Sequence, residues 1–290
     1  MQKMKLEGRW VVVTGASAGL GREISIVLAR DWGANVIPVA RRADRLEALA
    51  TEIREKYGRE CVPMGADLAS AHGPERVFDK ATDGRDVYGA ILNAGVTFSG
   101  HAIEQDHDDF ERMLATNVSS QVSLSKRFGR YLADKGDGGG IMLVSSLTAM
   151  APFPYQAAYA GTKAFLTTYG RSLAHELRKR DVSVTVFMPG GIATDMLEVS
   201  GMGKWKKGDV GVMDVDVCAH EAVRGFVKRK EFHVPGFVNQ LSAIAMKLAP
   251  HALAVKVIAK IYNDGQHASA AAAPATPEAA PAAESRKELS

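Results

Sequence analysis

Several kinds of feature are scarce in this 290-residue sequence, and each scarcity excludes a class of protein. The two cysteines, Cys61 and Cys218, are too few for a disulfide framework or a cysteine-ligated metal cluster. We therefore expect two reduced structural thiols, no metal site and a cytoplasmic location. The N-terminus lacks the long apolar segment of a signal peptide, and no run of about 18 apolar residues is present to form a spanning helix.

Charge of one sign is not in excess either. The sequence has 36 basic and 33 acidic residues, a net charge of +3, which is too balanced for a nucleic-acid-binding surface. Residues 204–207 (KWKK) and Lys228–Lys230 form local basic runs. Solvated charge in a loop or at a helix end is the favoured interpretation of both runs, and contact with an acidic partner is the alternative.

Short apolar runs alternate with helical patterns along most of the chain. We expect strands at residues 10–13, 35–40, 61–64, 90–92, 140–144 and 182–188. Helical patterns separate them, notably 45–57, 107–133 and 157–180. This alternation predicts an α/β protein in which helices cover both faces of a Rossmann-type, doubly wound parallel sheet.

The C-terminal part differs from the rest. We expect one domain over residues 1–236, a helical extension over 237–264 and a disordered Ala/Pro-rich tail over 265–290, which is nearly free of large apolar residues.

The extension is apolar and is broken near Pro250. It has two apolar stripes at helical spacing, Phe237, Leu241, Ile244 and Leu248 in the first and Leu253, Val257 and Ile261 in the second, with Lys256 and Lys260 flanking the second. Packing against the core or another subunit is favoured, while a substrate lid or contact with a membrane surface remains open.

A glycine-rich loop follows the first expected strand and opens the first helix. It reads Thr14-Gly15-Ala16-Ser17-Ala18-Gly19-Leu20-Gly21. Glycines allow a tight turn and close approach to a ligand, and a helix N-terminus attracts a pyrophosphate. The position between strand and helix favours a nucleotide site over a purely structural turn.

The end of the second strand carries Arg41 and Arg42 and no carboxylate. An acidic residue there would bind the ribose 2′-hydroxyl of NAD, whereas guanidinium groups match a 2′-phosphate. The sequence therefore favours NADP(H), the alternative being that both arginines are surface charges at a helix start.

Tyr159 and Lys163 are four residues apart in a helical pattern, so they share one face. A nearby ammonium lowers the pKa of a phenol, which would make Tyr159 a proton donor and acceptor for a carbonyl/alcohol pair. Tyr155 has no such lysine and is expected to line a wall. Ser145 and Ser146 end the fifth strand, at the sheet edge where ligands bind.

Taken together and in order, these motifs resemble the classical short-chain dehydrogenase/reductase family over roughly residues 6–236. Further matches are Asp67-Leu68 beside the adenine, Asn93-Ala94-Gly95 after the fourth strand, the helix asparagine Asn117, and Ser146 thirteen residues before Tyr159. The resemblance also implies that a segment with Pro189, Gly190, Ile192 and Thr194 holds the nicotinamide amide. The cofactor-binding residues that it implies are Gly15, Ser17, Gly19, Leu20, Gly21, Arg41, Arg42, Asp67, Leu68, Asn93, Ala94, Gly95, Tyr159, Lys163, Pro189, Gly190, Ile192 and Thr194.

The resemblance implies reversible hydride transfer between NADP(H) and a ketone or secondary alcohol. In this reaction Tyr159 acts as general acid/base, Lys163 lowers its pKa and binds the nicotinamide ribose, Ser146 positions the carbonyl, and Asn117 anchors a relay water. Leu92 departs from the family, which usually has asparagine there, and we expect only a packing consequence. A catalytically idle NADP(H)-binding relative and a membrane-associated reductase are the alternatives.

The substrate itself cannot be derived from the sequence. Met150, Phe153, Tyr155, Met188 and Met196 could line an apolar pocket for a lipophilic substrate, or could belong to the core. The glycine-containing segment 196–213 is expected to be a mobile lid. The long helices at 107–133 and 157–180 are of the kind that family members pair into homodimers or homotetramers.

Overall fold

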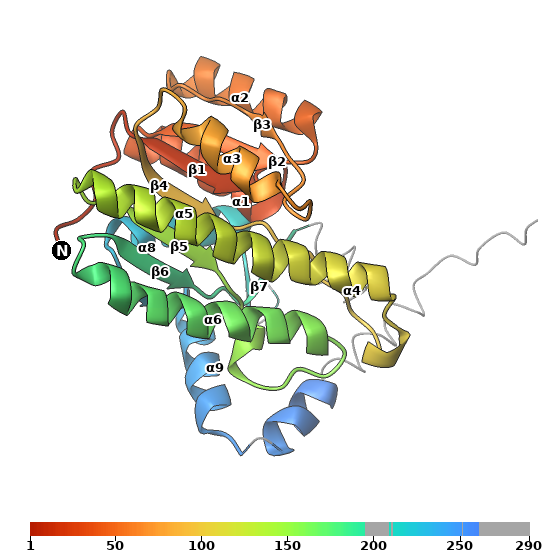
Figure 1. Cartoon of the computed structure of the whole chain (residues 1–290). Coiled ribbons are helices and arrows are strands. Elements are labelled where there is room, and N and C mark those ends of the chain that lie inside the picture. Colours follow the sequence, from red (N-terminus) through yellow and green to blue (C-terminus); the bar gives the residue numbers. More distant parts are fainter. Residues whose placement is uncertain (195–208, 210, 251, 261–290) are drawn as a thin grey trace, which may run out of the picture.

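A parallel sheet of seven strands forms the centre of the protein (Figure 1). The computed structural model describes residues 1–194, 209, 211–250 and 252–260. The strand order is β3-β2-β1-β4-β5-β6-β9, and all neighbouring strands in it are parallel. The strands are β1 (Trp10–Thr14), β2 (Asn35–Ala40), β3 (Met64–Gly65), β4 (Val87–Leu92), β5 (Gly140–Val144), β6 (Ser183–Phe187) and β9 (Phe232–His233). The predicted doubly wound fold is confirmed.

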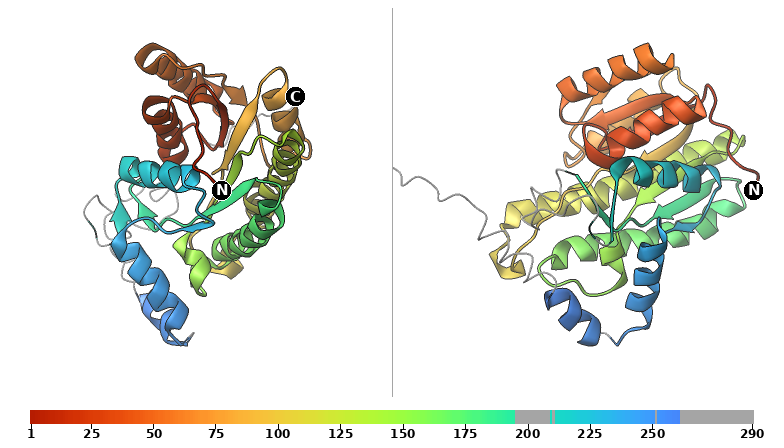
Figure 2. Two further views of the ribbon diagram at one scale, coloured as in Figure 1. Left: turned by 90° about the vertical axis from the view of Figure 1, so that its left-hand side faces the viewer. Right: turned by 180° about the vertical axis from the view of Figure 1, so that it is seen from behind.

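Helices cover both faces of the sheet and bury an apolar cluster on each (Figures 1 and 2). On one face lie α1 (Gly19–Trp32), α2 (Ala43–Tyr57) and α8 (Val215–Val227). On the other lie α3 (Gly73–Thr82), α5 (Ser120–Lys135) and α6 (Ala157–Arg178). Strands buried on both faces need continuous apolar runs, which explains why β2, β4, β5 and β6 are buried along their whole length.

Two predicted elements differ from the structure. The expected strand 61–64 is reduced to β3 at Met64–Gly65, with an isolated bridge between Cys61 and Val36. Pro63 has no amide hydrogen to donate to a strand ladder, which accounts for the interruption. The expected helix 107–133 is instead α4 (His107–Leu114), a π-helical turn (Ala115–Ser119) and α5.

Both cysteines are free and buried, as predicted. Lys228 and Lys230 are exposed just after α8, which agrees with solvated charge at a helix end. Within the described ranges, no helix is long and apolar enough to span a membrane, and no group of three potential metal-ligating side chains was found. Residues 204–207, Met196, Ile261 and the predicted tail lie outside the described residues, as does most of the predicted lid.

The extension begins with α9 (Phe237–Leu248), and residues 252–260 form a second helix, so the predicted break near Pro250 is confirmed. The prediction that the first apolar stripe packs against the core of the domain is wrong. Phe237, Leu241, Ile244 and Leu248 are exposed, while Asn239 and Ala243 on the other face of α9 are buried. A helix exposed on its apolar face has the same periodicity as one buried on it, so the spacing could not distinguish the two.

Candidate active site

The glycine loop packs closely between β1, α1 and the end of β4. Gly15 has a φ of +70°, and a Cβ atom there would lie 2.9 Å from the Cα of Ala94. A Cβ on Gly21 would lie 2.5 Å from the carbonyl oxygen of Gly15. The N-cap residue Ala18 provides no side-chain cap, and the first turn of α1 has no acidic residue. The amides of that turn are therefore suited to an anion such as a pyrophosphate.

Thr14 joins the ends of β1 and β4. Its buried hydroxyl accepts hydrogen bonds from the amides of Asn93 and Ala94, both at 3.0 Å. The side-chain Nδ2 of Asn93 donates to the carbonyl oxygen of Thr14 at 3.0 Å. The structure thus brings the glycine loop and the Asn93-Ala94-Gly95 motif together at the carboxyl edge of the sheet. The role of Thr14 as the connecting residue was not predicted.

Arg42 is already oriented toward the glycine loop. Its Nε and Nη2 atoms donate to the hydroxyl of Ser17 at 3.1 and 2.9 Å, and both Arg41 and Arg42 are exposed. Both arginines directly follow β2, and the guanidinium group of Arg42 lies beside the loop that would bind the pyrophosphate. This arrangement offers positive charge and hydrogen-bond donors where an NADP(H) 2′-phosphate is expected.

Asp67 lies after β3 and is held by two donors. It accepts from the amide of Ala69 at 3.0 Å and from Nη2 of Arg112 on α4 at 2.8 Å. Burial opposes ionisation of Asp67, but these hydrogen bonds, with the charges of Arg112 and Arg41, lower its pKa below the usual value. Neighbouring Leu68 is buried in the core. The contribution of Arg112 was missed because 45 residues separate the two partners.

The π-helical turn places Asn117 inside the protein, where it is fully buried. Its Oδ1 accepts from the amide of Val96 at 2.8 Å, and its Nδ2 donates to the carbonyl oxygen of Val96 at 2.9 Å and to the hydroxyl of Thr162 at 3.1 Å. A Cβ on Gly95 would lie 3.4 Å from both Oδ1 of Asn117 and Nζ of Lys163. Asn117 therefore joins the chain after β4 to the helix that carries Tyr159.

The two serines after β5 have different surroundings. The hydroxyl of Ser145 is buried and bonds to the carbonyl oxygen of Lys163 at 2.9 Å and to the hydroxyl of Thr167 at 2.7 Å, so it attaches β5 to α6. Ser146 is the N-cap residue of the short 3₁₀ helix η3 (Leu147–Met150) and is hydrogen-bonded to Tyr159. Ser146 is thus the serine beside the tyrosine, as predicted.

Burial, rather than Lys163, has the largest effect on the pKa of Tyr159 in this structure. Burial raises the pKa of Tyr159 to about 12, opposed only by the hydrogen bond with Ser146. Burial also lowers the pKa of Lys163 to about 8. The Nζ of Lys163 donates to the carbonyl oxygen of Val144 at 2.8 Å and lies 5.6 Å from the centroid of the Tyr159 ring. Lys163 is therefore not among the groups that lower the pKa of Tyr159 here.

The segment after β6 closes the site from the other side. The carbonyl oxygen of Pro189 accepts from the amide of Leu147 at 2.9 Å. A Cβ on Gly19 would lie 3.3 Å from Cγ2 of Thr194, so this segment reaches the glycine loop. Ile192 lies in β7 (Gly191–Ile192), which pairs with β8 (Val212–Met213).

Gly190 is in close contact with the extension. A Cβ on Gly190 would lie 2.5 Å from Oδ1 of Asn239, a buried residue of α9. The segment expected to hold the nicotinamide is thus supported by α9. Sequence reasoning missed Asn239, because no motif identifies a residue whose role is to contact a glycine 49 positions earlier.

The residues considered for an apolar pocket have different surroundings in the structure. Tyr155 has a φ of +64°, which is unusual for a tyrosine, and its ring packs edge-on against His101 with centroids 5.2 Å apart. Nε2 of Gln156 donates to Thr97 and Ser99 at 3.2 and 3.1 Å, so the loop after β4 is attached to the segment before α6. Met188 is fully buried in a small core cluster, against which Met150 packs, so of the two alternatives for Met188 the structure supports the core.

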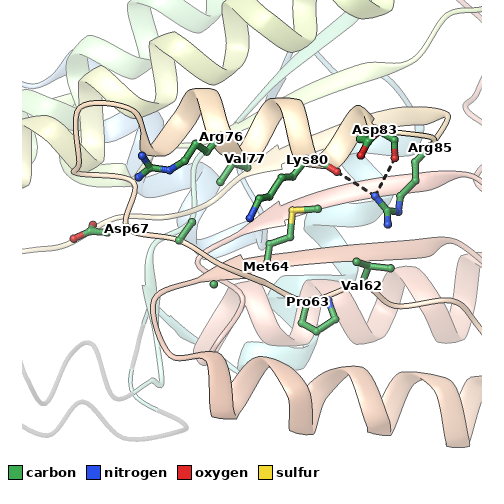
Figure 3. Close-up of a pocket in the computed structure, with 11 residues that line it drawn as sticks. Val62, Pro63, Met64, Asp67, Arg76, Val77, Lys80, Asp83 and Arg85 are labelled. Atoms are coloured by element: carbon green, nitrogen blue, oxygen red, sulfur yellow. Dashed lines mark hydrogen bonds between the residues drawn. The ribbon is translucent and has the colours of Figure 1, made fainter.

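A separate pocket of about 490 Å³ lies between β3 and α3 (Figure 3). Its lining includes Asp67, Arg76 and Lys80, together with Arg85, whose Nη1 donates to the carbonyl oxygens of Lys80 and Asp83. None of the four predicted catalytic residues lines it. We therefore do not assign it to the reaction.

Comparison with known proteins gives consistent matches. A family model described as "short chain dehydrogenase" matches residues 9–204. The tetrahydroxynaphthalene reductase of Pyricularia oryzae is 28% identical over 200 residues, which cover 67% of this chain and 68% of that protein.

Two solved structures have the same fold. A short-chain dehydrogenase from Sphingobium yanoikuyae in complex with NADPH has a TM-score of 0.74 at 24% identity, covering 93% of this chain and 98% of the other. A structure described as giving insights into 7beta-hydroxysteroid dehydrogenase stereoselectivity has a TM-score of 0.78 at 26% identity, covering 89% of this chain and 100% of the other.

Proposed function

Because the chain belongs to the short-chain dehydrogenase family, whose members are oxidoreductases of carbonyl and alcohol groups, we propose that it transfers a hydride between NADP(H) and a lipophilic ketone or secondary alcohol. The observation that carries the proposal is the convergence of Ser146, Tyr159, Lys163 and Asn117 on the sheet edge that also carries the glycine loop. These residues come from three segments: Asn117 from the π-helical turn, Ser146 from the residue before η3, and Tyr159 and Lys163 from α6.

The residues present fit the cofactor. Gly15 and Gly21 allow the tightly packed loop before and into α1, whose first-turn amides suit a pyrophosphate, and Arg41 and Arg42 with Ser17 suit a 2′-phosphate. The NADPH complex of the Sphingobium yanoikuyae protein agrees with this choice. When bound, the nicotinamide supplies or accepts the hydride.

The residues of the protein bind the substrate oxygen and transfer a proton to it or from it. Ser146 donates a hydrogen bond to the oxygen and sets its position. Tyr159, protonated at neutral pH because its pKa is about 12, gives its proton to the oxygen during reduction. Lys163 orients the cofactor ribose and adds positive charge while its ammonium is protonated. Asn117 keeps the start of the loop after β4 aligned with α6.

The proposed preference for lipophilic substrates rests on the aromatic pair and on relatives. His101 and Tyr155 form a ring contact beside the segment that leads to Tyr159. The names of the tetrahydroxynaphthalene reductase and the hydroxysteroid dehydrogenase point to bulky ring systems as substrates of those proteins. We therefore expect this chain to favour bulky ring ketones over sugars.

The test is loss of NADPH absorbance across a carbonyl panel of steroids, aromatic ketones, long-chain 3-oxo compounds and sugars. NADH and the Tyr159→Phe variant are the controls. Turnover of one lipophilic class that is lost in the variant supports the proposal. Tight NADPH binding without turnover in either direction would favour a catalytically idle binder instead.

Association into a homodimer or homotetramer in the cytoplasm is also part of the proposal. Phe165 on α6 is 45% exposed and stacks on Tyr169 with ring centroids 5.9 Å apart, which gives α6 an apolar outer surface. Burial of this surface by a second α6 would be a physical reason for pairing. Light scattering of the purified protein, with Phe165→Glu beside it, measures the subunit number directly.

A further inference from the structure

The two C-terminal helices form what we call the helical arm, made of α9 and residues 252–260. In two views at right angles the arm extends beyond the sheet and its covering helices (Figures 1 and 2). The base of the arm is firmly attached. Asn239 contacts Gly190, Ala243 packs in a cluster with Leu147, and Nε2 of Gln240 donates to the carbonyl oxygen of Val234 at 3.0 Å.

The surface of the arm is unusually apolar. Seven of the eleven exposed large hydrophobic side chains found in the described part of the chain lie within it, so the exposure is concentrated there. Phe237 and Leu248, at the two ends of α9, are 73% and 77% exposed. The seven are Phe237, Val238, Leu241, Ile244, Leu248, Leu253 and Val257. A soluble monomer rarely exposes such a cluster without a partner for it.

The charges on the arm indicate which partner fits. Residues 237–260 contain no aspartate or glutamate, whereas Lys247, Lys256 and Lys260 are all exposed. A second copy paired through this face would bring two sets of lysines together without acidic residues from the arm to offset them. A lipid surface with anionic headgroups offers both an apolar layer and negative charge.

We propose that the helical arm docks on a membrane surface rich in anionic lipid. The exposed apolar side chains enter the boundary between headgroups and acyl chains, and the three lysines contact lipid phosphates. Twelve residues make α9 about 18 Å long, too short to cross the hydrocarbon layer, so α9 lies along the surface. The docking does not depend on the proposed reaction.

Docking also has a consequence for access to the site. The buried face of α9 packs near η3, which directly follows Ser146, and against Gly190. An arm seated on a bilayer therefore holds the catalytic edge close to the lipid, where a lipophilic carbonyl compound is concentrated. The extension would thus give the active site access to lipophilic compounds in the bilayer.

The experiment is co-sedimentation of the full chain with phosphatidylcholine vesicles and with vesicles that also contain phosphatidylglycerol. Leu241→Glu/Ile244→Glu removes apolar contact, and Lys247→Glu/Lys256→Glu/Lys260→Glu reverses the charge. Val217→Glu on α8 is the matched control, since Val217 is an exposed hydrophobic residue outside the arm. Circular dichroism and NADPH binding verify that each variant is folded.

We expect binding to the anionic vesicles that falls at least tenfold in both arm variants, weakens with salt and is unchanged in Val217→Glu. Equal binding of wild type and arm variants would overturn the proposal. Absence of vesicle binding by the wild type would also overturn it. Sedimentation velocity would then show whether Leu241→Glu/Ile244→Glu dissociates a dimer, and dissociation would identify the apolar face as a contact between copies.

Discussion

The ammonium nitrogen of Lys163 lies 2.8 Å from the carbonyl oxygen of Val144, while it is 5.6 Å from the centroid of the Tyr159 ring. The lysine is therefore hydrogen-bonded to the end of β5, and Ser146 is the residue that stabilises the phenolate of Tyr159. Half-buried Tyr159 and buried Lys163 lie side by side at the catalytic edge, and their pKa values are moved in opposite directions, to about 12 and about 8. The first predictions follow from this pair.

Tyr159→Phe should lower kcat about 10²–10⁴-fold, because the general acid is removed while the ring is kept. NADPH affinity should change little. Stopped-flow measurement of hydride transfer together with fluorescence titration of NADPH separates the two effects. Tyr155→Phe is the matched control, and we expect it to retain kcat. A Tyr159→Phe enzyme with near wild-type kcat would exclude Tyr159 from the acid role.

Lys163→Met should stabilise the cofactor-free protein at pH 7 by about 2 kcal/mol while abolishing activity. Charging the buried lysine opposes folding, and loss of the hydrogen bond to Val144 offsets only part of the gain. Because the folded pKa of about 8 is below the ordinary value of 10.5, the unfolded chain binds the extra proton between these pH values. Wild-type stability from this group therefore rises with pH across that window.

The measurement is urea unfolding of wild type and Lys163→Met at pH 7 and at about pH 10. The advantage of the variant should be largest at pH 7 and should shrink at the higher pH. A difference that does not depend on pH would mean that Lys163 is not buried in its charged form at pH 7.

Arg42→Ala should raise the KM for NADPH about 10- to 100-fold and leave the KM for NADH unchanged, because a charge-assisted contact to the 2′-phosphate is lost. Arg42 is chosen for this change because its guanidinium group is hydrogen-bonded to Ser17 in the glycine loop. Arg45→Ala, an exposed arginine on α2, is the control. Steady-state kinetics with both cofactors decides the matter, and equal effects on NADPH and NADH would contradict the assignment.

Arg112→Leu should raise the KM for both NADPH and NADH, by about tenfold, with kcat retained. Arg112 acts through Asp67, which it holds by a 2.8 Å hydrogen bond, so it is a positioning residue for the adenine side. The pKa of Asp67 should rise toward its ordinary value in this variant, and NMR titration of the carboxyl carbon measures it. Arg112→Lys keeps the positive charge and should restore part of the affinity. If the pKa of Asp67 stays low in Arg112→Leu and Arg112→Lys restores no affinity, Arg112 does not act through Asp67.

Much of the fold and the site could be predicted because they depend on local patterns. Buried strands require continuous apolar runs, and Tyr159 and Lys163 share a helix face through their spacing alone. What could not be predicted depends on partners that are distant in sequence. Asp67 and Arg112, or Gly190 and Asn239, meet only once the sheet is assembled.

The sequence also could not predict which face of a helix meets the protein or how strongly a titratable group is desolvated. The periodicity of Phe237 and Leu241 indicated an amphipathic helix but not which face meets the protein, and the structure exposes the apolar one. The lysine spacing suggested a lowered pKa for Tyr159, yet burial of the phenol has the larger effect. Desolvation depends on everything that surrounds a group, so it cannot be derived from two residues.

Gly190→Ala provides the sharpest test of how the extension meets the active site. The added Cβ would lie 2.5 Å from Oδ1 of Asn239, and Gly190 does not have a positive φ that would strain an alanine. The loss should therefore come from the contact alone and amount to about 1–3 kcal/mol. Gly161→Ala on α6 is the matched control, because a Cβ there meets no atom within 4 Å, and we expect no loss of stability.

The double variant Gly190→Ala/Asn239→Ala identifies the partner. Removing the Asn239 amide makes room for the new methyl group, so the double variant should be more stable than the sum of the two single changes predicts. Thermal unfolding of the four proteins gives this coupling energy. Simple additivity would mean that Asn239 does not contact Gly190 in solution, and the extension would then have no direct influence on the segment expected to hold the nicotinamide.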